Sequence, residues 1–477
     1  MGTDVPVSNA AQTVLSRMER FHAWPLPRRL FLVIGLGYLF TFYDIFDVNV
    51  SFVQTATAII PGATPANASQ YIGLPIFANL LGYVVGTLVL SPFADRVGRR
   101  RMLMLTMFVT GVGSLLTALA VRDWMFVVAR GITGVGVAAD LAVVNTYMSE
   151  ISPRQARAKY TSGLFIFSGA GALVGIWLGL LLTTPRAPFP QGLPFALASS
   201  SFHWGWRLMY VIGAVLALIA LALRLELPES PRWLVAKGRV EEARKVVTAM
   251  EVRLGISAGE SSDSASVFTQ ASDTGTPYRD LLRSPVYRRR VMLLFCVWLF
   301  SYVTVYGFSA GMTTLLVGTG YAPSEAGLIV AVGVLGMFFA GVVAYLAGEA
   351  MERKVYLLIS AVLTIAGGLV VGLAGHELWL SYLGSMLLFF GQNLWVPVFY
   401  AWTAENFPSR ARTSGFALVD GAGHIGAGVG LWAIAPVIPT LGVTAGFVAM
   451  SGFLLLAALV ALGGIASRGK VLEEISP

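Results

Sequence analysis

The sequence predicts an all-α membrane protein in which twelve transmembrane helices form two pseudo-symmetric bundles of six. Three observations predict this fold: the composition of the chain, the spacing of its apolar segments and a duplication of two short motifs. Of the 477 residues, 56% are hydrophobic and 12% are charged, and the mean hydropathy is +0.73. A soluble protein carries about 25% charged residues. Most of this chain must therefore face lipid or other apolar helices.

Apolar segments long enough to cross a bilayer, about 20 residues each, occur twelve times. They begin near Leu30, Tyr71, Met102, Trp124, Tyr160, Leu208, Val291, Ala326, Val355, Leu378, Thr413 and Thr444. The predicted organisation is an N-terminal segment 1–29, a first bundle 30–223, a linker 224–290, a second bundle 291–467 and a tail 468–477. Within the linker, the spacing over 228–254 predicts an amphipathic helix, and the polar composition of 257–276 predicts disorder.

The positions of the Lys and Arg residues predict the orientation of the chain. If both termini lie on one side, that side holds all but four of the 33 basic residues. The exceptions are Arg122, Arg186 and Arg207 on the opposite side, and Arg130 inside a span. Because cytoplasmic loops carry the excess of Lys and Arg, we expect a multi-pass protein of the cell membrane with both termini cytoplasmic. The net charge of +8 then reflects insertion topology, and no nucleic-acid partner is expected.

Two motifs occur twice, at nearly the same separation in the chain. The pattern E-x-x-P-x-x-x-R runs from Glu150 to Arg157 after the fourth span, and from Glu405 to Arg412 after the tenth. The charged loop 94–100 after the second span aligns with the charged loop 348–354 after the eighth. Two bundles related in this way can rock about a central site and expose it alternately to each side. The duplication thus favours a transporter and gives no support to an enzyme.

The loop after the second span carries a pattern of known type. Asp95-Arg96-x-Gly98-Arg99-Arg100 resembles the loop signature of the major facilitator superfamily, and the segment that starts at Arg130 resembles its fourth-helix motif. Residues 228–234, PESPRWL, resemble the signature of sugar porters and related solute–cation symporters. The resemblance implies a monomer in the lipid bilayer that binds a small solute and protons, without a cofactor or metal.

Charged residues at the cytoplasmic ends of helices are candidates for conformational gating, because contacts made in one conformation only bias the equilibrium between inward and outward states. An acidic side chain there can also accept hydrogen bonds from the N-terminus of a neighbouring helix. The alternative interpretation is that the basic residues serve insertion topology alone. The candidates are the charged residues Asp95, Arg96, Arg99, Glu150, Arg157, Glu349, Arg353, Glu405 and Arg412, together with Gly98 of the same loop and Arg130 inside the fourth span.

Ionisable residues inside predicted spans are candidates for proton coupling, because such residues are costly at bilayer depth. Asp44 and Asp47 lie three residues apart and share one helical face, and Asp140 lies in the fourth span. Repulsion and burial both disfavour ionisation, so at least one of the three should bind and release a proton near neutral pH. The alternative is a structural ion pair, in which Arg130 neutralises Asp44 or a group on another helix. Asp420 lies four residues before His424, on the same helical face, but it is nearer one end of its span and could be interfacial.

The second bundle supplies candidates for solute binding. Trp298, Tyr302 and Tyr306 recur every four residues, and rings with a polar edge suit a wet cavity for a small polar solute. The tenth span adds Gln392, Asn393, Trp395 and Tyr400. In the eleventh, His424 fits a proton relay, a solute ligand or a core histidine whose hydrogen bonds are satisfied. Helix packing is the alternative role for each aromatic residue.

Asp44-x-x-Asp47 together with Asp140 is similar to the arrangement in proton-coupled phosphate symporters. In that group an aspartate stands at the position of Tyr302 and a lysine at that of His424. Sugar porters carry paired glutamines in the seventh span, which this chain lacks. We therefore expect proton-coupled symport of a small polar metabolite, with an organic anion favoured. The alternatives are symport of a sugar, polyol or phosphate, export of an amphipathic compound, and a nutrient sensor of transporter fold. The ten residues after Ser467 are short for a signalling extension.

Overall fold

The computed structural model describes residues 9–153, 157–256, 281–348, 350–375, 377–407 and 412–468. Within these residues, eleven helices are each long and apolar enough to cross a membrane. The tenth span is divided at Trp395 into α15 (Leu378–Leu394) and α16 (Val396–Glu405), where Pro397 interrupts the helical hydrogen bonding. Together they complete the twelve predicted spans, and the predicted all-α fold is confirmed.

Each half of the chain supplies six spans, and each span begins close to its predicted residue. The N-terminal half contains α2 (Arg28–Ile59), α3 (Ser69–Val85), α5 (Arg99–Ala118), α6 (Asp123–Ile151), α7 (Arg157–Thr183) and α8 (Gly205–Arg224). The C-terminal half contains α12 (Pro285–Gly318), α13 (Pro323–Ala347), α14 (Arg353–Leu373), the α15–α16 pair, α17 (Arg412–Ile434) and α18 (Ile438–Ala461). A π-helical turn, η2 (Gly86–Leu90), and α4 (Ser91–Val97) extend α3.

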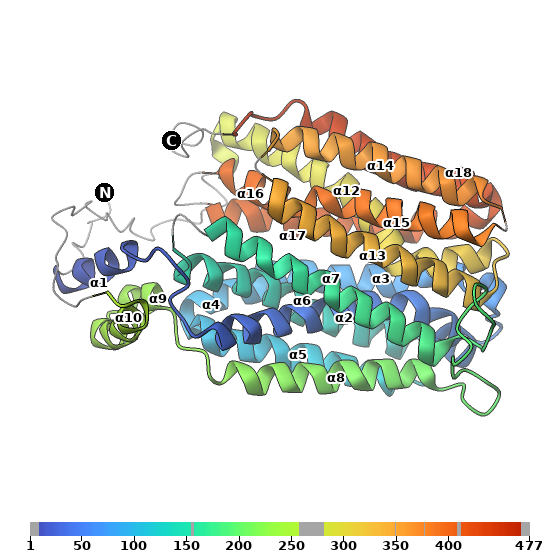
Figure 1. The fold of residues 1–477 in the computed structure, drawn as a ribbon, viewed down its shortest axis with the longest axis horizontal. Helices are drawn as coiled ribbons and strands as arrows, with labels where there is room; N and C mark the ends of the chain where they lie inside the picture. Colours follow the sequence, from blue (N-terminus) through green and yellow to red (C-terminus); the bar gives the residue numbers. More distant parts are fainter. Residues whose placement is uncertain are drawn as a thin grey trace.

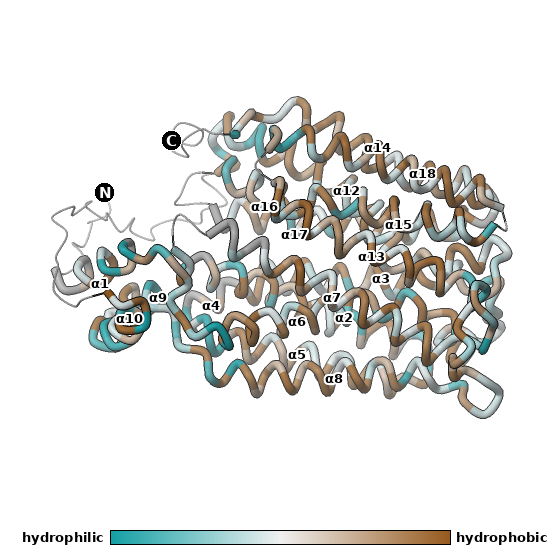
Figure 2. Tube along the Cα trace, in the orientation of Figure 1, coloured by the Kyte–Doolittle hydropathy of each residue, from teal (hydrophilic) through white to brown (hydrophobic). Residues whose placement is uncertain are grey.

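The two halves lie side by side along the long axis, and three short helices gather at one end of the molecule (Figure 1). These are α1 (Asn9–Glu19), α9 (Pro231–Ala236) and α10 (Val240–Leu254). Hydrophobic residues follow the long helices, whereas hydrophilic residues gather at the ends, above all around α1 and α10 (Figure 2). This distribution matches a body that crosses the hydrocarbon layer with polar ends in water.

Helix α1 lies in the segment for which the sequence predicted no helix. It packs on α10 and buries Val14 and Met18. The single helix expected over 228–254 is divided into α9 and α10 by a turn at Gly238, which has a positive φ. Arg17 donates to the Glu251 carboxylate and to the Thr248 hydroxyl, 2.8 Å away. Charged groups that are partly buried and paired in this way hold a short helix that its own propensity would not keep folded. The stretch 257–276, predicted to be disordered, lies outside the described residues.

The duplicated motifs make the same contacts in both halves. Arg99 at the start of α5 pairs with Glu150 near the end of α6 at 2.8 Å, and Arg353 at the start of α14 pairs with Glu405 at the end of α16 at 3.5 Å. Arg99 also donates to the Ala94 carbonyl at 3.0 Å, and its counterpart Arg353 donates to the Gly348 carbonyl at 2.9 Å. The sequence repeat is therefore a repeat of ion pairs, each within one half.

Glu229 occupies the helix N-terminus that the sequence analysis associated with an acidic loop residue. Its carboxylate accepts from the backbone N–H of Arg99 at 2.9 Å and of Arg100 at 3.2 Å, and an anion at this end also interacts favourably with the helix dipole. Gly98, with φ +107°, lets the loop pass beneath this carboxylate. Arg96 lies over the Phe93 ring. The side chains of Asp95, Arg157 and Arg412, and residue Glu349, lie outside the described structure.

We predict that Gly98→Ala lowers the thermal unfolding midpoint of the purified protein. A Cβ at this position would overlap the Glu229 carboxylate, and a backbone in a sparsely populated region costs about 1–3 kcal/mol for other residues. Gly62→Ala is the matched control, because Gly62 also has a positive φ but has open space around it. Equal midpoints for the two variants would contradict the proposed contact with Glu229.

Candidate functional site

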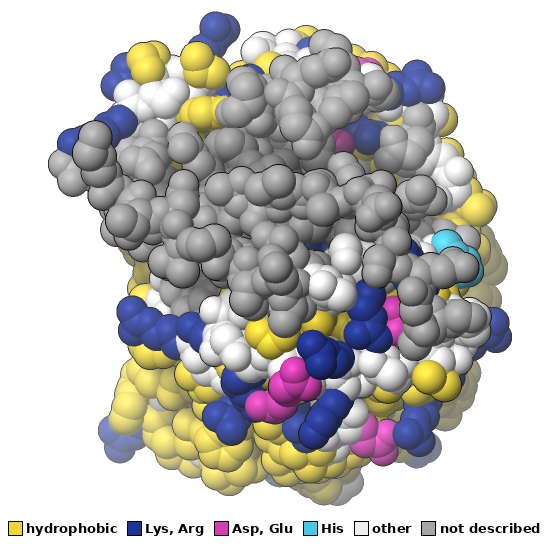
Figure 3. Space-filling model, turned by 90° about the vertical axis from the view of Figure 1, so that its left-hand side faces the viewer, with side chains coloured by type: hydrophobic (Ala, Val, Ile, Leu, Met, Phe, Trp, Pro, Cys, Tyr) yellow, Lys and Arg dark blue, Asp and Glu magenta, His cyan; other side chains and the backbone are white. Residues whose placement is uncertain are grey.

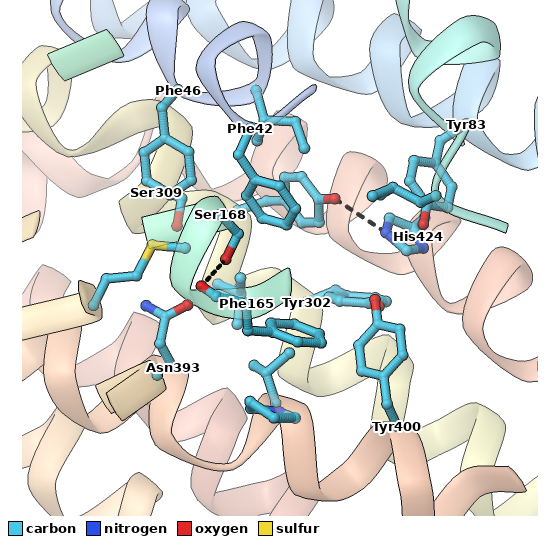
Figure 4. A pocket seen from close by; sticks show the side chains of 18 residues that line it. Phe42, Phe46, Tyr83, Phe165, Ser168, Tyr302, Ser309, Asn393, Tyr400 and His424 are labelled. Atoms are coloured by element: carbon cyan, nitrogen blue, oxygen red, sulfur yellow. Dashed lines mark hydrogen bonds between the residues drawn. The ribbon is translucent and has the colours of Figure 1, made fainter. Parts of the chain in front are cut away.

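A cavity lies between the two halves, near the middle of the long helices. Its lining consists mostly of aromatic and aliphatic side chains, with a few hydroxyl, amide and imidazole groups (Figure 4). Helices of both halves contribute. The lining residues are Phe42, Ile45, Phe46, Tyr83, Leu141, Phe165, Ser168, Tyr302, Val305, Tyr306, Ser309, Met337, Gly341, Asn393, Val396, Pro397, Tyr400 and His424.

His424 lies between two tyrosines from opposite halves. Its ring stacks on Tyr83 of α3 with centroids 3.7 Å apart, and it lies 3.9 Å from the Tyr302 ring of α12. Nδ1 is 2.7 Å from the backbone carbonyl of Asp420, so Nδ1 must carry a hydrogen. In the neutral ring Nε2 then accepts from the Tyr306 hydroxyl at 3.1 Å, the bond drawn in Figure 4. Stacking and two hydrogen bonds fix the ring at the cavity wall.

The structure separates the predicted solute-binding residues into two layers. Tyr302, Tyr306, Asn393 and His424 line the cavity, whereas Trp298, Gln392 and Trp395 are buried behind it. The Trp298 ring packs on Trp395 at 5.2 Å, and its Nε1 donates to Thr403 at 3.0 Å. Tyr400 also lines the cavity, and so do Tyr83 and the phenylalanines of α2, which the sequence analysis did not select. Their signal was weak because apolar spans contain many aromatic residues.

Asp44 and Asp47 of α2 are bridged by one arginine. Arg130 Nη1 lies 3.4 Å from Asp44 Oδ2 and 3.5 Å from Asp47 Oδ1, and Nη2 donates to the Asp44 carbonyl at 3.0 Å. Ser114 donates to the other Asp44 oxygen at 2.5 Å, whereas Asp47 Oδ2 is buried without a hydrogen-bond partner. The expectation that these acids are unpaired and repel each other is therefore wrong, and the alternative pairing with Arg130 describes the structure.

Asp140 of α6 has its own cation. Arg224 at the end of α8 donates to both Asp140 oxygens, and the hydroxyls of Thr41 and Thr106 donate to the same carboxylate at 3.2 and 2.8 Å. The Arg224 side chain is fully buried, although the sequence placed residue 224 at the start of the cytoplasmic linker. Because Arg224 ends an apolar segment, nothing in the sequence indicated that its side chain points back into the bundle.

Asp420 of α17 is buried inside the protein, with 3% of its surface exposed. Its carboxylate accepts a hydrogen bond from the Tyr302 hydroxyl. The sequence analysis did not select Asp420 as a site residue. Its four-residue spacing to His424, noted in the sequence, places both side chains on one face of the helix.

Asn49 of α2 joins the two halves on the side of the cavity away from α1. Its Nδ2 donates to the carbonyls of Phe308 at 2.9 Å and Ser309 at 2.7 Å, and its Oδ1 accepts from the Thr313 N–H at 3.2 Å and hydroxyl at 2.7 Å. In a regular helix the Thr313 N–H would donate to Ser309. The Asn49 amide therefore replaces this backbone hydrogen bond of α12 and holds α2 and α12 together.

We predict that Asn49→Ala increases opening between α2 and α12. The variant should lose about 1.4 kcal/mol of the free energy that favours the closed state, which is the scale of one or two net hydrogen bonds. This loss raises the fraction of open molecules about tenfold. With Cys296 replaced by serine and Ser309→Cys as reporter, an impermeant maleimide should label the variant faster from that side. Thr55→Val is the control, because its buried hydroxyl bonds its own helix. Equal labelling rates in both variants would contradict a closing role for Asn49.

Comparisons with known proteins agree with this arrangement. The family model described as "Sugar (and other) transporter" matches residues 30–477. The niacin transporter NiaP of Acinetobacter baylyi is 25% identical over 97% of this chain and 99% of its own length. The 4-hydroxybenzoate transporter PcaK of Pseudomonas putida is 28% identical over 94% of each chain.

A solved structure shares the fold over nearly the whole chain. The partially occluded inward-open xylose transporter XylE from E. coli superposes with a TM-score of 0.71 at 18% identity, and the match covers 96% of this chain and 99% of that one. Among the described residues, no group of three or more His, Cys, Asp or Glu side chains could hold a metal ion.

Proposed function

The chain belongs to the sugar (and other) transporter family of the major facilitator superfamily, and we propose that it is a proton-coupled symporter of small aromatic carboxylates. It is a multi-pass membrane transporter, not an enzyme. The observation that carries the proposal is the single guanidinium of Arg130 between two buried carboxylates. The cavity lining and the relatives then indicate the class of solute.

The Asp44–Asp47–Arg130 cluster can hold one exchangeable proton. With both acids ionised, one guanidinium leaves a net negative charge in a buried site, and an uncompensated buried charge is costly. One proton restores neutrality. Asp47 Oδ2, which has no hydrogen-bond partner, is the oxygen with room for it. Asp140 instead has a cation of its own and four hydrogen-bond contacts, so we assign it a role in holding α6 against α8.

The cavity favours a planar, largely apolar solute. Tyrosine and phenylalanine rings form most of its wall, and Ser168, Ser309, Asn393 and His424 supply uncharged polar groups. No lysine or arginine occurs among the described residues that line the cavity, so these residues offer an anion no fixed positive charge. A co-transported proton supplies that charge. The relatives named for niacin and 4-hydroxybenzoate carry aromatic carboxylic acids, which fit such a wall.

Alternating access requires the halves to rock about this cavity. The Arg99–Glu150 and Arg353–Glu405 pairs each hold one half together as a rigid unit, whereas the Asn49 contacts cross between halves and must break when that side opens. The end of the molecule with α1 and α10 carries many Lys and Arg side chains (Figure 3). By the positive-inside rule we place this end and both termini in the cytoplasm of a cell-membrane protein that acts as a monomer.

We predict that Asp47→Asn abolishes proton-driven accumulation of nicotinate or 4-hydroxybenzoate in liposomes. The variant fixes the cluster in a neutral state, so it should still exchange labelled for unlabelled solute. Asp140→Asn, which leaves Arg224 without its partner, should reduce solute exchange itself. Asp123→Asn, at the exposed start of α6, is the control and should accumulate normally. Full accumulation by Asp47→Asn would exclude that residue as the coupling acid.

The solute class is tested by competition. Nicotinate and 4-hydroxybenzoate should raise the thermal unfolding midpoint and should compete with each other for uptake. D-xylose and inorganic phosphate should do neither, because the cavity presents few polar groups to a sugar and no cation to phosphate. A sugar is the informative alternative solute, because the solved structure that shares this fold is a xylose transporter. Stabilisation by D-xylose alone would overturn the aromatic assignment and leave the transporter assignment intact.

A further inference from the structure

Asp420 differs from the other buried aspartates described above, because no cation pairs with it. Asp44 and Asp47 share Arg130, and Asp140 binds Arg224. For Asp420, in contrast, the described residues provide no ion pair, and its hydrogen-bond partners are the phenols of Tyr302 and Tyr83. We propose that Asp420 is a second proton-binding site, and that it must be protonated when an anionic solute occupies the cavity. The second part rests on the proposed function.

The groups that face Asp420 are phenols and one imidazole. These side chains belong to α2, α3, α12, α16 and α17 itself. The turn η2 also packs on α17 but contributes no titratable group. The titratable neighbours are Tyr38, Tyr83, Tyr302, Tyr306, Tyr400 and His424. The imidazole Nδ1 is committed to the Asp420 backbone carbonyl, so it does not reach the carboxylate. An ionised Asp420 therefore has phenolic dipoles around it and no opposite charge.

Tyrosine side chains that line the cavity lie between it and this carboxylate. Tyr302 lines the cavity with its ring and donates its hydroxyl to Asp420. Charges interact strongly across such a low-dielectric distance. A solute carboxylate in the cavity would be repelled by ionised Asp420, and a proton on Asp420 removes this repulsion. Proton and anion therefore bind together, and each favours the other equally.

Protonation also changes what Tyr302 can do. An ionised aspartate only accepts hydrogen bonds, whereas a protonated one carries an O–H that donates. When Asp420 donates to the Tyr302 oxygen, the phenolic hydrogen is released for a new acceptor. The carboxylate of a solute in the cavity is such an acceptor. The proton on Asp420 is thus converted into a hydrogen-bond donor at the binding site, without a fixed cation there.

The proton itself can be observed without any solute. Infrared difference spectra of the purified protein across a pH titration should show the carbonyl stretch of a protonated carboxylic acid. Asp420→Asn should remove a component of this band, and Asp47→Asn should retain that component. Asparagine still accepts from Tyr302, so the fold should be preserved, which the unfolding midpoint checks. Identical spectra for wild type and Asp420→Asn at every pH would overturn the proposal. This outcome is independent of which solute is transported.

Coupling to the solute is measured by binding of nicotinate and 4-hydroxybenzoate as a function of pH. Wild-type affinity should fall by up to about tenfold per pH unit as the Asp420 proton is lost. The affinity of Asp420→Asn for these compounds should depend less steeply on pH, by the equivalent of one proton. Asp420→Glu should restore the wild-type pH dependence. An unchanged slope in Asp420→Asn would overturn the coupling. Failure of wild type to bind either compound would instead reject the solute class, while the infrared result would still decide the proton site.

Discussion

The charge balance inside the bundles is the constraint on which the structure and its function depend. The N-terminal half buries three carboxylates and two guanidinium groups among α2, α6 and α8, and charges in such surroundings persist only when they are paired. Arg224 and Asp140 balance each other and fix two helices. Arg130 balances only one of its two acids, which leaves the cluster one positive charge short. That deficit is what a proton can fill.

The C-terminal half uses different chemistry on its side of the cavity. Tyr302, Tyr306 and His424 form a wall of polar-edged rings, and Asp420 lies behind it. This half thus offers surfaces that a planar solute can contact, whereas the buried aspartates paired with arginine lie in the other half. The duplicated ion pairs at the helix ends show that both halves retain the same framework. The difference between them lies in the few side chains that face or support the cavity.

Much of the fold and part of the site could be predicted from the sequence. Span positions follow from hydropathy, and Arg99, Glu150, Arg353 and Glu405 follow from the repeat. Partners across helices could not be predicted, because spacing along one helix does not determine which face meets which neighbour. Arg224 is the clearest case, since a residue at the end of an apolar run gives no sign that it is buried. Helix α1 was missed because its stability comes from contacts with α10 and not from its own residues.

The central claim is that a proton supplies the charge that the cavity and the Arg130 cluster lack. The direct measurement is simultaneous recording of proton and nicotinate influx into liposomes that contain the wild-type protein, under a pH gradient with the membrane potential clamped to zero. The account predicts that protons enter in a fixed ratio with solute and that collapsing the gradient stops accumulation. Solute accumulation without accompanying protons would contradict it.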